Sequence, residues 1–295
     1  MAAHRFSFDR VRRLFFPTDA GRLDEKRANA ARKEAVRKER RRRAAQVARD
    51  AEQSGDVAVV DYPRHEIRIL VTSDAERKWR TTACAKEPWT VAWLDARVRP
   101  GEVLYDIGAN VGVFSLIAGT LLEGHGAVVA FEPGYANYAR LCENIVLNEL
   151  EERIIPVPLP LSSRTGLQAF TYRSVEPGQS RHTFTGEAWT GGAPRPKHRR
   201  YSQPMLGMTL DAAVSLFALP RPTLIKLDVD GAELHVLEGA QETLAVEALR
   251  SLVVEIDGEL TDPVMALLAR FGFRLVERPD RGRDKKAWYG IFARE

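Results

Sequence analysis

After Gly101 the chain alternates short apolar runs with helical patterns of apolar residues. In the helical patterns the large apolar residues lie three or four positions apart, as in Tyr138, Leu141 and Ile145, so that they share one face of a helix. Strands that alternate with helices predict an α/β fold, a doubly wound and mostly parallel sheet with helices on both faces. The predicted strands cover residues 103–107, 127–131, 154–157, 223–227 and 251–254.

The C-terminal part of the sequence predicts further helical segments and two more strands. Leu234, Leu237 and Leu244 continue the helical spacing. Thr261 begins another helix and Gly272 ends it, because Thr favours a helix start and Gly a helix end. The last two strands are predicted over residues 273–276 and 288–293.

Residues 1–55 predict a basic helical extension that is partly mobile. Residues 24–52 consist largely of Ala, Arg, Lys and Glu, so the helix has few apolar side chains to bury and should be solvated. Residues 1–23 carry a short basic amphipathic pattern. Such a pattern could contact an anionic membrane surface or an anionic partner, but we favour a plain surface helix packed on the body.

Residues 56–99 predict a strand and a helix that precede the core as a cap. Ile67 and Ile69 alternate with polar neighbours, the period of a half-exposed strand. Pro88 suits the first turn of a helix. Trp89 and Trp93 lie one turn apart and are expected to pack in the core rather than line the active site.

The net charge of +4 is unevenly distributed along the chain. Residues 1–50 contain 16 Lys and Arg against seven Asp and Glu, and the remainder of the chain is net acidic. The basic character therefore belongs to the extension, so the overall basicity of the chain is poor evidence for a nucleic-acid enzyme. No apolar run approaches the length of about 18 residues that a transmembrane segment needs. The two cysteines, Cys84 and Cys142, are expected to be free thiols in a reducing cytoplasm.

Residues 100–295 are expected to form one doubly wound domain that a long loop interrupts. Residues 173–205 contain Gly, Pro, Arg and His and show little periodicity. A loop of this length in a compact domain is usually functional or mobile. We expect a substrate lid whose cations recognise an anionic or hydroxyl-rich acceptor, with a disordered insertion as the alternative.

A glycine-rich turn follows Asp106 at the end of the first strand of this domain. Gly108, Asn110 and Gly112 lie two positions apart, before a helix that begins near Val113. A strand, turn and helix of this kind present backbone N–H groups to a ligand. A dinucleotide fingerprint needs glycine at the first, third and sixth positions, and Asn110 and Val113 break it. The loop suits an amino-acid-bearing ligand, with Asp106 facing the ligand ammonium.

A second acidic residue ends the next strand. Glu132-Pro133 follows the apolar run at residues 127–131. An acid about 20 residues beyond a glycine loop can accept hydrogen bonds from both ribose hydroxyls. Either carboxylate alone could be an ordinary strand-end residue, but the two acids and the loop together favour a nucleoside-bearing ligand.

Charged residues also end the strand predicted at residues 223–227. Lys226 and Asp228 lie two positions apart and therefore share a face of the strand. Gly231 permits a sharp turn, and Glu233 enters the next helix. Taken alone, a buried structural Lys–Asp pair would be the preferred interpretation.

Three stretches of the sequence closely resemble FkbM-family methyltransferases: residues 105–115, 131–133 and 225–239, in this order. The resemblance covers roughly Glu87 to the C-terminus. It implies a Rossmann-like class I methyltransferase sheet with one antiparallel strand and S-adenosylmethionine as the cofactor. It also implies O-methylation of sugars, polyketides or other secondary products. Asp230 departs from the family pattern, which usually has Glu there.

With this cofactor, the strand-end residues acquire expected roles. Asp228 would be the base, or the hydrogen-bond acceptor that orients the hydroxyl, and Lys226 would keep it ionised. Glu255 is a second candidate for the base. No metal is expected, because the His and carboxylate residues show no ligand spacing. The cofactor is expected to contact Asp106, Gly108, Ala109, Asn110, Gly112, Phe131, Glu132, Pro133 and Ser162.

Two other functions stay open at this point, an RNA ribose methyltransferase and a non-catalytic S-adenosylmethionine-binding module. The Lys–Asp pair and the basic extension suit the first, but the body is net acidic and shows no aromatic-rich basic groove. The second is conceivable because a fold alone never establishes an activity. Since Asp228 and the loop glycines are present, we expect an enzyme with a small-molecule or glycan acceptor.

Overall fold

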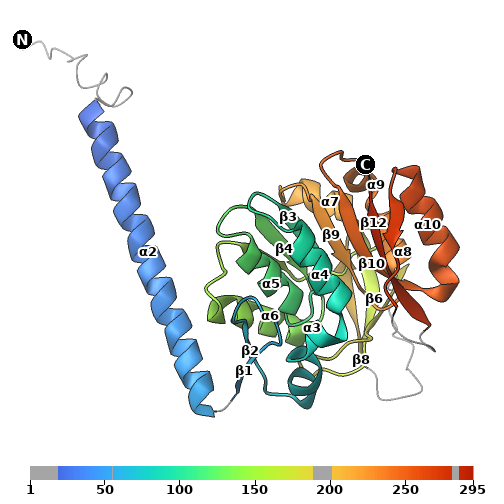
Figure 1. Ribbon diagram of the computed structural model, residues 1–295, viewed down its shortest axis with the longest axis horizontal. Helices are drawn as coiled ribbons and strands as arrows, with labels where there is room; N and C mark the ends of the chain where they lie inside the picture. The colour runs from blue at the N-terminus through green and yellow to red at the C-terminus, as the bar shows by residue number, and fades with distance from the viewer. Residues whose placement is uncertain (1–18, 55, 189–200, 281–285, 295) are drawn as a thin grey trace, which may run out of the picture. The chain divides into compact units, whose positions relative to one another are not determined.

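The structure is a computed structural model of the 295-residue chain, and it describes residues 19–54, 56–188, 201–280 and 286–294. The chain forms two compact units, Met1–Gln46 and Val47–Glu295. Figure 1 shows the elements of both units along the chain. No helix of the described residues is both long and apolar enough to cross a membrane.

The described part of the first unit is helical. Helix α2 spans Asp19–Ser54 and so continues into the second unit. It includes the helix predicted over residues 24–52, and each of its side chains whose exposure is described is exposed. The amphipathic pattern predicted within residues 1–23 lies mostly outside the described residues.

A central sheet of seven strands organises the second unit, with the strand order β11-β12-β10-β9-β3-β4-β5. Neighbouring strands from β10 to β5 run parallel, and β12 is antiparallel to both β10 and β11. The mostly parallel sheet with one antiparallel strand is therefore confirmed. The strands are β3 (Val103–Ile107), β4 (Ala127–Phe131), β5 (Ile154–Val157), β9 (Leu224–Leu227), β10 (Ser251–Asp257), β11 (Arg274–Glu277) and β12 (Ala287–Ala293).

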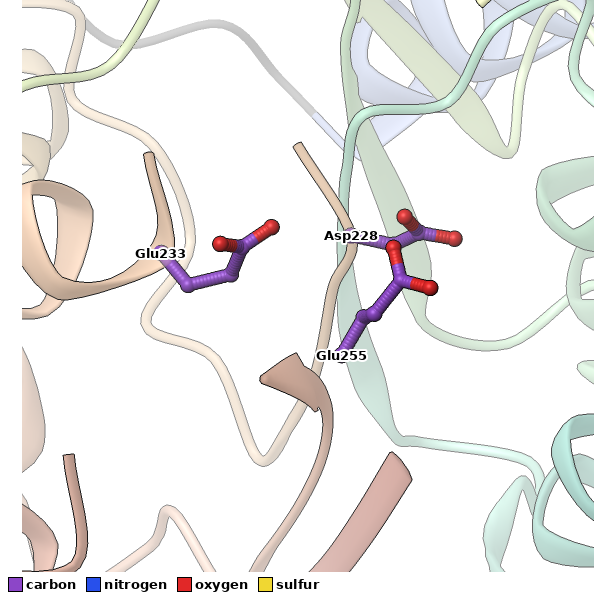
Figure 2. A group of neighbouring side chains, drawn as sticks. All are labelled: Asp228, Glu233 and Glu255. Atoms are coloured by element: carbon purple, nitrogen blue, oxygen red, sulfur yellow. The ribbon is translucent and has the colours of Figure 1, made fainter. Parts of the chain in front are cut away.

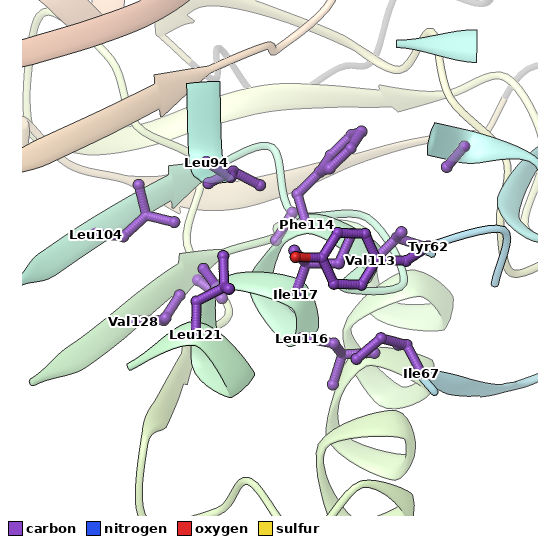
Figure 3. Close-up of a cluster of buried hydrophobic side chains, with 14 of the residues drawn as sticks. Tyr62, Ile67, Leu94, Leu104, Val113, Phe114, Leu116, Ile117, Leu121 and Val128 are labelled. Carbon is purple, nitrogen blue, oxygen red and sulfur yellow. The ribbon is translucent and has the colours of Figure 1, made fainter. Parts of the chain in front are cut away.

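Apolar side chains cover both faces of this sheet. Leu104 and Val128 belong to one buried cluster, and their chain neighbours Tyr105 and Val129 belong to a second, because successive side chains of a strand point to opposite faces. Figure 3 shows the first cluster, in which Leu94 packs with strand and helix residues. Helices α4 (Pro88–Arg97), α5 (Val113–Leu121) and α6 (Tyr135–Leu147) contribute to the first cluster. Helices α7 (Leu210–Leu216), α8 (Glu233–Glu238), α9 (Gln241–Leu244) and α10 (Thr261–Arg270) contribute to the second.

The helical pattern predicted through Leu244 is divided in the structure into α8 and α9. Gly239 lies between the two helices. A Cβ atom at Gly239 would lie 2.1 Å from the carbonyl oxygen of Ser162, so only glycine allows this close approach. The break therefore brings the segment after β5 against the α8–α9 junction.

The segment before the sheet forms a small hairpin and several short helices. Strands β1 (Val57–Val59) and β2 (Arg68–Leu70) pair antiparallel. A π-helical turn, η1 (Glu76–Arg80), and helix α3 (Ala83–Lys86) lead to α4, whose start at Pro88 confirms the predicted helix. Trp93 is buried and donates a hydrogen bond from Nε1 to Ser251 Oγ at 2.9 Å, in agreement with its predicted place in the core.

A second, smaller sheet corrects the loop predicted over residues 173–205. Strand β7 and all but the last two residues of β8 fall in that range; the two strands lie on either side of β6, and both pair with it antiparallel. The loop prediction is therefore wrong for these strands, while residues 189–200 lie outside the described residues. Pairing with β6 is a long-range interaction that the local pattern does not show. The strands are β6 (Gly166–Tyr172), β7 (Thr183–Ala188) and β8 (Tyr201–Gly207).

Candidate active site

The parallel register brings the carboxyl ends of three strands to one edge of the sheet. Ile107 of β3 lies opposite Phe131 of β4 and Leu227 of β9. The residues that follow these strands therefore meet at this edge, where doubly wound sheets bind their ligands. A cavity of about 810 Å³ opens there, within the size range of small-molecule and cofactor sites.

The turn after β3 forms part of the wall of this cavity. Gly108, Asn110 and Gly112 all have positive φ angles, a conformation that Gly adopts freely and Asn tolerates. A Cβ atom at Gly108 would lie 1.9 Å from the backbone oxygen of Asp228. The glycine thus lets the backbone of the turn contact the backbone at the end of β9, which brings two walls of the cavity together.

Glu132 lines the cavity at the end of β4, as expected from the sequence. Its Oε2 atom accepts a hydrogen bond from the backbone N–H of Asn110 at 2.8 Å, and Oε1 accepts one from Gly134 at 2.7 Å. Burial raises the pKa of Glu132 to about 7, although these N–H groups act in the opposite direction. The carboxylate is therefore oriented beside the turn and is poorly solvated.

Ala109, Phe131 and Pro133 also line the cavity, together with Gly108 and Asn110 of the turn. Gly112 is not among the lining residues and faces Leu141 of the core, so its expected direct cofactor contact is not supported. Leu159, Pro160 and Leu161 form a further part of the wall.

The structure places Asp106 behind the cavity wall instead of facing a ligand ammonium. The side chain is fully buried and is not among the residues that line the cavity. Its Oδ2 atom accepts a hydrogen bond from Ser115 Oγ at 2.6 Å, and Oδ1 lies 3.3 Å from Lys226 Nζ. Asp106 thus compensates the charge of Lys226, which corrects its expected contact with the ligand.

Ser162 likewise does not line the cavity. Its side chain is fully buried, and its hydroxyl donates to Gln168 Oε1 at 2.9 Å. Its backbone N–H donates to the carbonyl oxygen of Met208 at 2.8 Å. Ser162 therefore joins the start of β6 and the end of β8 to the core, and the expected direct cofactor contact is not supported.

Lys226 and Asp228 meet at the cavity, as their spacing predicts. Lys226 Nζ lies 3.9 Å from Asp228 Oδ2, and the hydroxyl of Tyr289 donates to the same oxygen at 2.8 Å. Burial alone would raise the pKa of Asp228, but Lys226, Glu255 and Tyr289 lower it below its ordinary value. The pKa of Lys226 is raised, because its two carboxylate neighbours, Asp106 first, outweigh the effect of burial. Asp228 is thus an ionised carboxylate at the cavity surface.

Three carboxylates form an acidic cluster at the same edge: Asp228 after β9, Glu233 at the start of α8, and Glu255 on β10 (Figure 2). One oxygen of each side chain lies within 4.8 Å of the corresponding oxygens of the other two. All three line the cavity. The spacing of these residues along the chain did not predict a metal site. The fold brings their carboxylate oxygens together.

Several cavity residues come from segments without a sequence signal for the site. Arg80 ends the π-helical turn, and its Nε and Nη2 atoms donate to the carbonyl oxygen of Gly178 at 3.0 and 2.6 Å. π-Helical turns are frequent at functional sites, but sequence does not predict them. Lys86 and Tyr289 also line the cavity, and their long-range contacts with the site depend on the fold.

The small sheet adds an aromatic wall to the cavity. Phe170, His182 and Phe184 line it, and the ring of His182 lies 5.7 Å from that of Phe170. Burial lowers the pKa of His182 to about 4, with a further contribution from Arg80. The imidazole is therefore neutral near pH 7 and acts there as part of an apolar and aromatic surface.

Comparisons with known proteins identify the family. Residues 106–275 match the methyltransferase FkbM domain. The hexuronic acid methyltransferase AglP of Haloferax volcanii is 29% identical over 198 residues, 67% of this chain and 73% of that protein. The 31-O-demethyl-FK506 methyltransferase FkbM of Streptomyces tacrolimicus is 29% identical over 217 residues, 62% of this chain and 76% of that protein.

A solved structure of the precorrin-6Y C5,15-methyltransferase of Geobacter metallireducens superposes with a TM-score of 0.41 and 15% sequence identity. The superposition covers 70% of this chain and 85% of that chain.

The cavity fits S-adenosylmethionine in size and in the chemistry of its wall. Glu132 offers carboxylate oxygens for ribose hydroxyls, the turn presents backbone at Gly108 and Asn110, and Leu161 and Phe170 offer apolar surface for a purine. The family match begins at Asp106, directly before this turn, and extends past the end of β10. The chain therefore belongs to the FkbM methyltransferase domain family and is an S-adenosylmethionine-dependent methyltransferase.

Proposed function

We propose that the protein transfers the methyl group to a hydroxyl of a sugar, a glycan or a secondary metabolite. The names of its relatives support this class of acceptor, since one acts on a hexuronic acid and another on 31-O-demethyl-FK506. The observation that carries the proposal is the Asp228 carboxylate at the cavity surface, hydrogen-bonded by Tyr289 and adjacent to Lys226.

In this proposal Asp228 orients the acceptor hydroxyl and accepts its proton. An ionised carboxylate is a hydrogen-bond acceptor, and Lys226 together with Tyr289 favours its ionised form. A base in such a position typically contributes about 10²–10⁴-fold to the rate. Glu255, which lines the same wall, is the second candidate for the proton acceptor.

S-Adenosylmethionine, when bound, supplies a methyl group on a sulfonium that leaves as a neutral thioether. The main task of the chain is to align the acceptor oxygen with this methyl group, and orientation of this kind can contribute about 7–11 kcal/mol. The close contact of Gly108 with the backbone of Asp228 places the turn proposed to bind the methyl donor next to the Asp228 carboxylate. We propose that Glu132 binds the ribose and that the backbone of the turn contacts the methionyl part.

Cations at the cavity suit an anionic or hydroxyl-rich acceptor. Arg80, Lys86 and Arg181 line the cavity, and Arg80 is held in place by the carbonyl oxygen of Gly178. Guanidinium groups bind carboxylates with defined geometry. We propose that Arg80, Lys86 and Arg181 contribute to acceptor binding. Residues 173–188 and the small sheet would then form the side of the cavity that determines which acceptor binds.

The basic extension is proposed to attach the enzyme to an anionic partner or membrane surface. Helix α2 exposes its described Lys and Arg side chains, and polybasic segments bind anionic surfaces. Cys84 and Cys142 are free thiols, in keeping with the reducing cytoplasm that we propose as the compartment.

The test is methyl transfer from radiolabelled S-adenosylmethionine to separated glycan, lipid, small-molecule and RNA fractions of a cell extract. Label in a glycan or small-molecule fraction that alkali does not release excludes a methyl ester, and its identification as a methoxy group by mass spectrometry supports the proposal. Alkali-labile label would indicate a methyl ester, and label confined to RNA would indicate a ribose methyltransferase. The Asp228→Asn protein serves as the control that binds the donor without turnover.

A further inference from the structure

The acidic cluster of Asp228, Glu233 and Glu255 brings three carboxylates together at the cavity. Lys226 lies 3.9 Å from Asp228, but the same ammonium lies closer, at 3.3 Å, to Asp106. One cation is thus shared by two carboxylates. Among the described residues, no Lys, Arg or His forms an ion pair with Glu233. Carboxylates this close repel one another unless a proton or a cation lies between them.

Glu233 gives a second and independent indication of a ligand. The side chain is 1% exposed, and its Oε1 atom accepts hydrogen bonds from the backbone N–H groups of Val229 at 3.0 Å and Gly231 at 3.1 Å. Its Oε2 atom is buried and has no hydrogen-bond partner. An unsatisfied buried carboxylate oxygen is costly. Figure 2 shows that the side chain extends from α8 toward Asp228 and Glu255.

We propose that the acidic cluster binds a divalent cation of the Mg²⁺, Mn²⁺ or Ca²⁺ class, with one oxygen from each of Asp228, Glu233 and Glu255. An all-oxygen ligand set suits these hard cations and not zinc or copper. Oxygens on opposite sides of Ca²⁺ lie about 4.6–5.2 Å apart, and those of Mg²⁺ about 4.0–4.2 Å. The separation of at most 4.8 Å between the cluster oxygens therefore lies within the range of Ca²⁺, whereas Mg²⁺ would draw any oxygens farther apart than about 4.2 Å closer together.

The remaining ligand positions of the cation would face the cavity, because all three side chains line it. Hydroxyl or carboxylate oxygens of an acceptor could occupy these positions, which would place the acceptor beside Asp228. A bound cation also lowers the pKa of a hydroxyl that it coordinates. This role in acceptor binding rests on the proposed function, whereas the binding of the cation itself does not.

The proposal is tested by direct binding of cations to the full-length protein. Isothermal titration calorimetry with MgCl₂, MnCl₂ and CaCl₂, and loss of the Mn²⁺ electron paramagnetic resonance signal, should give a Kd of about 1 mM or tighter for at least one of them. Glu233→Gln and Glu255→Gln should each weaken binding about tenfold or more. Glu259→Gln, an exposed carboxylate shortly after β10, is the matched control and should bind like the wild type.

The Gln variants should fold like the wild type. At position 233 the amide oxygen can still accept hydrogen bonds from the N–H groups of Val229 and Gly231. Their circular dichroism spectra and their affinity for S-adenosylmethionine without metal should match the wild type. No cation binding at about 1 mM, or equal affinity in the wild type and both variants, overturns the proposal. Loss of S-adenosylmethionine binding in the wild type would instead contradict the donor site, so the two failures are distinguishable.

Discussion

Asp106 and Lys226 lie opposite each other on the neighbouring strands β3 and β9, and their side chains form a buried ion pair with an Nζ–Oδ1 distance of 3.3 Å. Both side chains are almost fully buried. Asp106 lies behind the cavity wall, and the Lys226 ammonium that it pairs with lies 3.9 Å from Asp228 at the cavity. The conformation of the candidate base is therefore coupled to the interior of the sheet.

Replacement of Lys226 by Met should destabilise the protein by about 3–5 kcal/mol, because Asp106 is then left as a buried, unpaired charge. Urea denaturation measures this loss. The double variant with Asp106→Asn should recover part of the stability, since the uncompensated charge is gone. A loss below about 1 kcal/mol, the value of exposed ion pairs, would show that Asp106 is solvated or protonated in the native protein.

Asp228→Asn should reduce kcat by about 10²–10⁴-fold while the Kd for S-adenosylmethionine stays the same. The amide preserves the shape but cannot accept the acceptor proton. Turnover with labelled donor and calorimetry of donor binding measure the two effects separately. Tyr289→Phe removes one hydrogen bond to the carboxylate and should cause a smaller loss. Intact turnover in Asp228→Asn would transfer the role of base to Glu255.

Glu132→Ala should weaken binding of S-adenosylmethionine by about 1–3 kcal/mol, since the ribose hydroxyls lose their acceptor. The backbone N–H groups of Asn110 and Gly134 also lose their partner, so Glu132→Gln, which retains one acceptor oxygen, is the milder companion. Calorimetry gives both affinities. The control is Glu123→Gln. Glu123 is exposed and precedes the amino end of β4, whereas Glu132 follows its carboxyl end. An unchanged Kd in Glu132→Ala removes Glu132 from the donor site.

The pH dependence of donor binding should follow the ionisation of Glu132, whose pKa burial raises to about 7. If the ionised carboxylate binds the ribose, the affinity should fall up to about tenfold per pH unit below pH 7. Calorimetry between pH 5.5 and 8 tests this, with the range chosen to bracket the pKa of about 7. The same slope in Glu132→Gln would assign the dependence to another group.

The stability of the unliganded protein should change in the opposite direction over this range. The folded-state pKa of Glu132, about 7, lies above its ordinary value of 4.5, so the folded state binds the proton more tightly. Its contribution to the free energy of unfolding should therefore decrease by about 1.4 kcal/mol per pH unit as the pH rises from 4.5 to 7. Glu132→Gln should remove this part of the slope in urea denaturation.

Removal of residues 1–46 should leave turnover on a free acceptor unchanged and abolish salt-sensitive binding to anionic vesicles. The deletion removes side chains that are exposed wherever their exposure is described. Cosedimentation with phosphatidylserine vesicles at low and high salt measures the binding, because polybasic attachment weakens with ionic strength. Equal cosedimentation of both proteins would contradict a role of the extension in attachment.

Local patterns in the sequence predicted the parts of the fold that depend on neighbouring residues. The apolar runs located β3, β4 and β5 at their observed bounds, and the glycine turn and Glu132 were placed at the cavity. These features depend on strand propensity and on backbone conformation, which residues close in sequence determine. The resemblance to the family supplied the cofactor.

The parts that the sequence did not predict depend on pairing between distant residues. The inward orientation of Asp106 follows from its register with Lys226, which no local pattern contains. Strands β7 and β8 form by pairing with β6, so residues 173–205 resembled a loop. The acidic cluster joins Glu255 to residues from another strand and helix, and Ser162 faces Gln168 because of the packing around β6.

The contact between Gly108 and the main chain at Asp228 has a consequence for how such an enzyme can diversify. The turn proposed to bind the methyl donor and the proposed proton acceptor Asp228 are in direct backbone contact, so a shift of one would displace the other. The cations and rings that face the acceptor come instead from Arg80, Lys86 and the small sheet, which attach at the periphery. New acceptors can thus be accommodated by altering these outer segments while the reactive geometry is inherited intact.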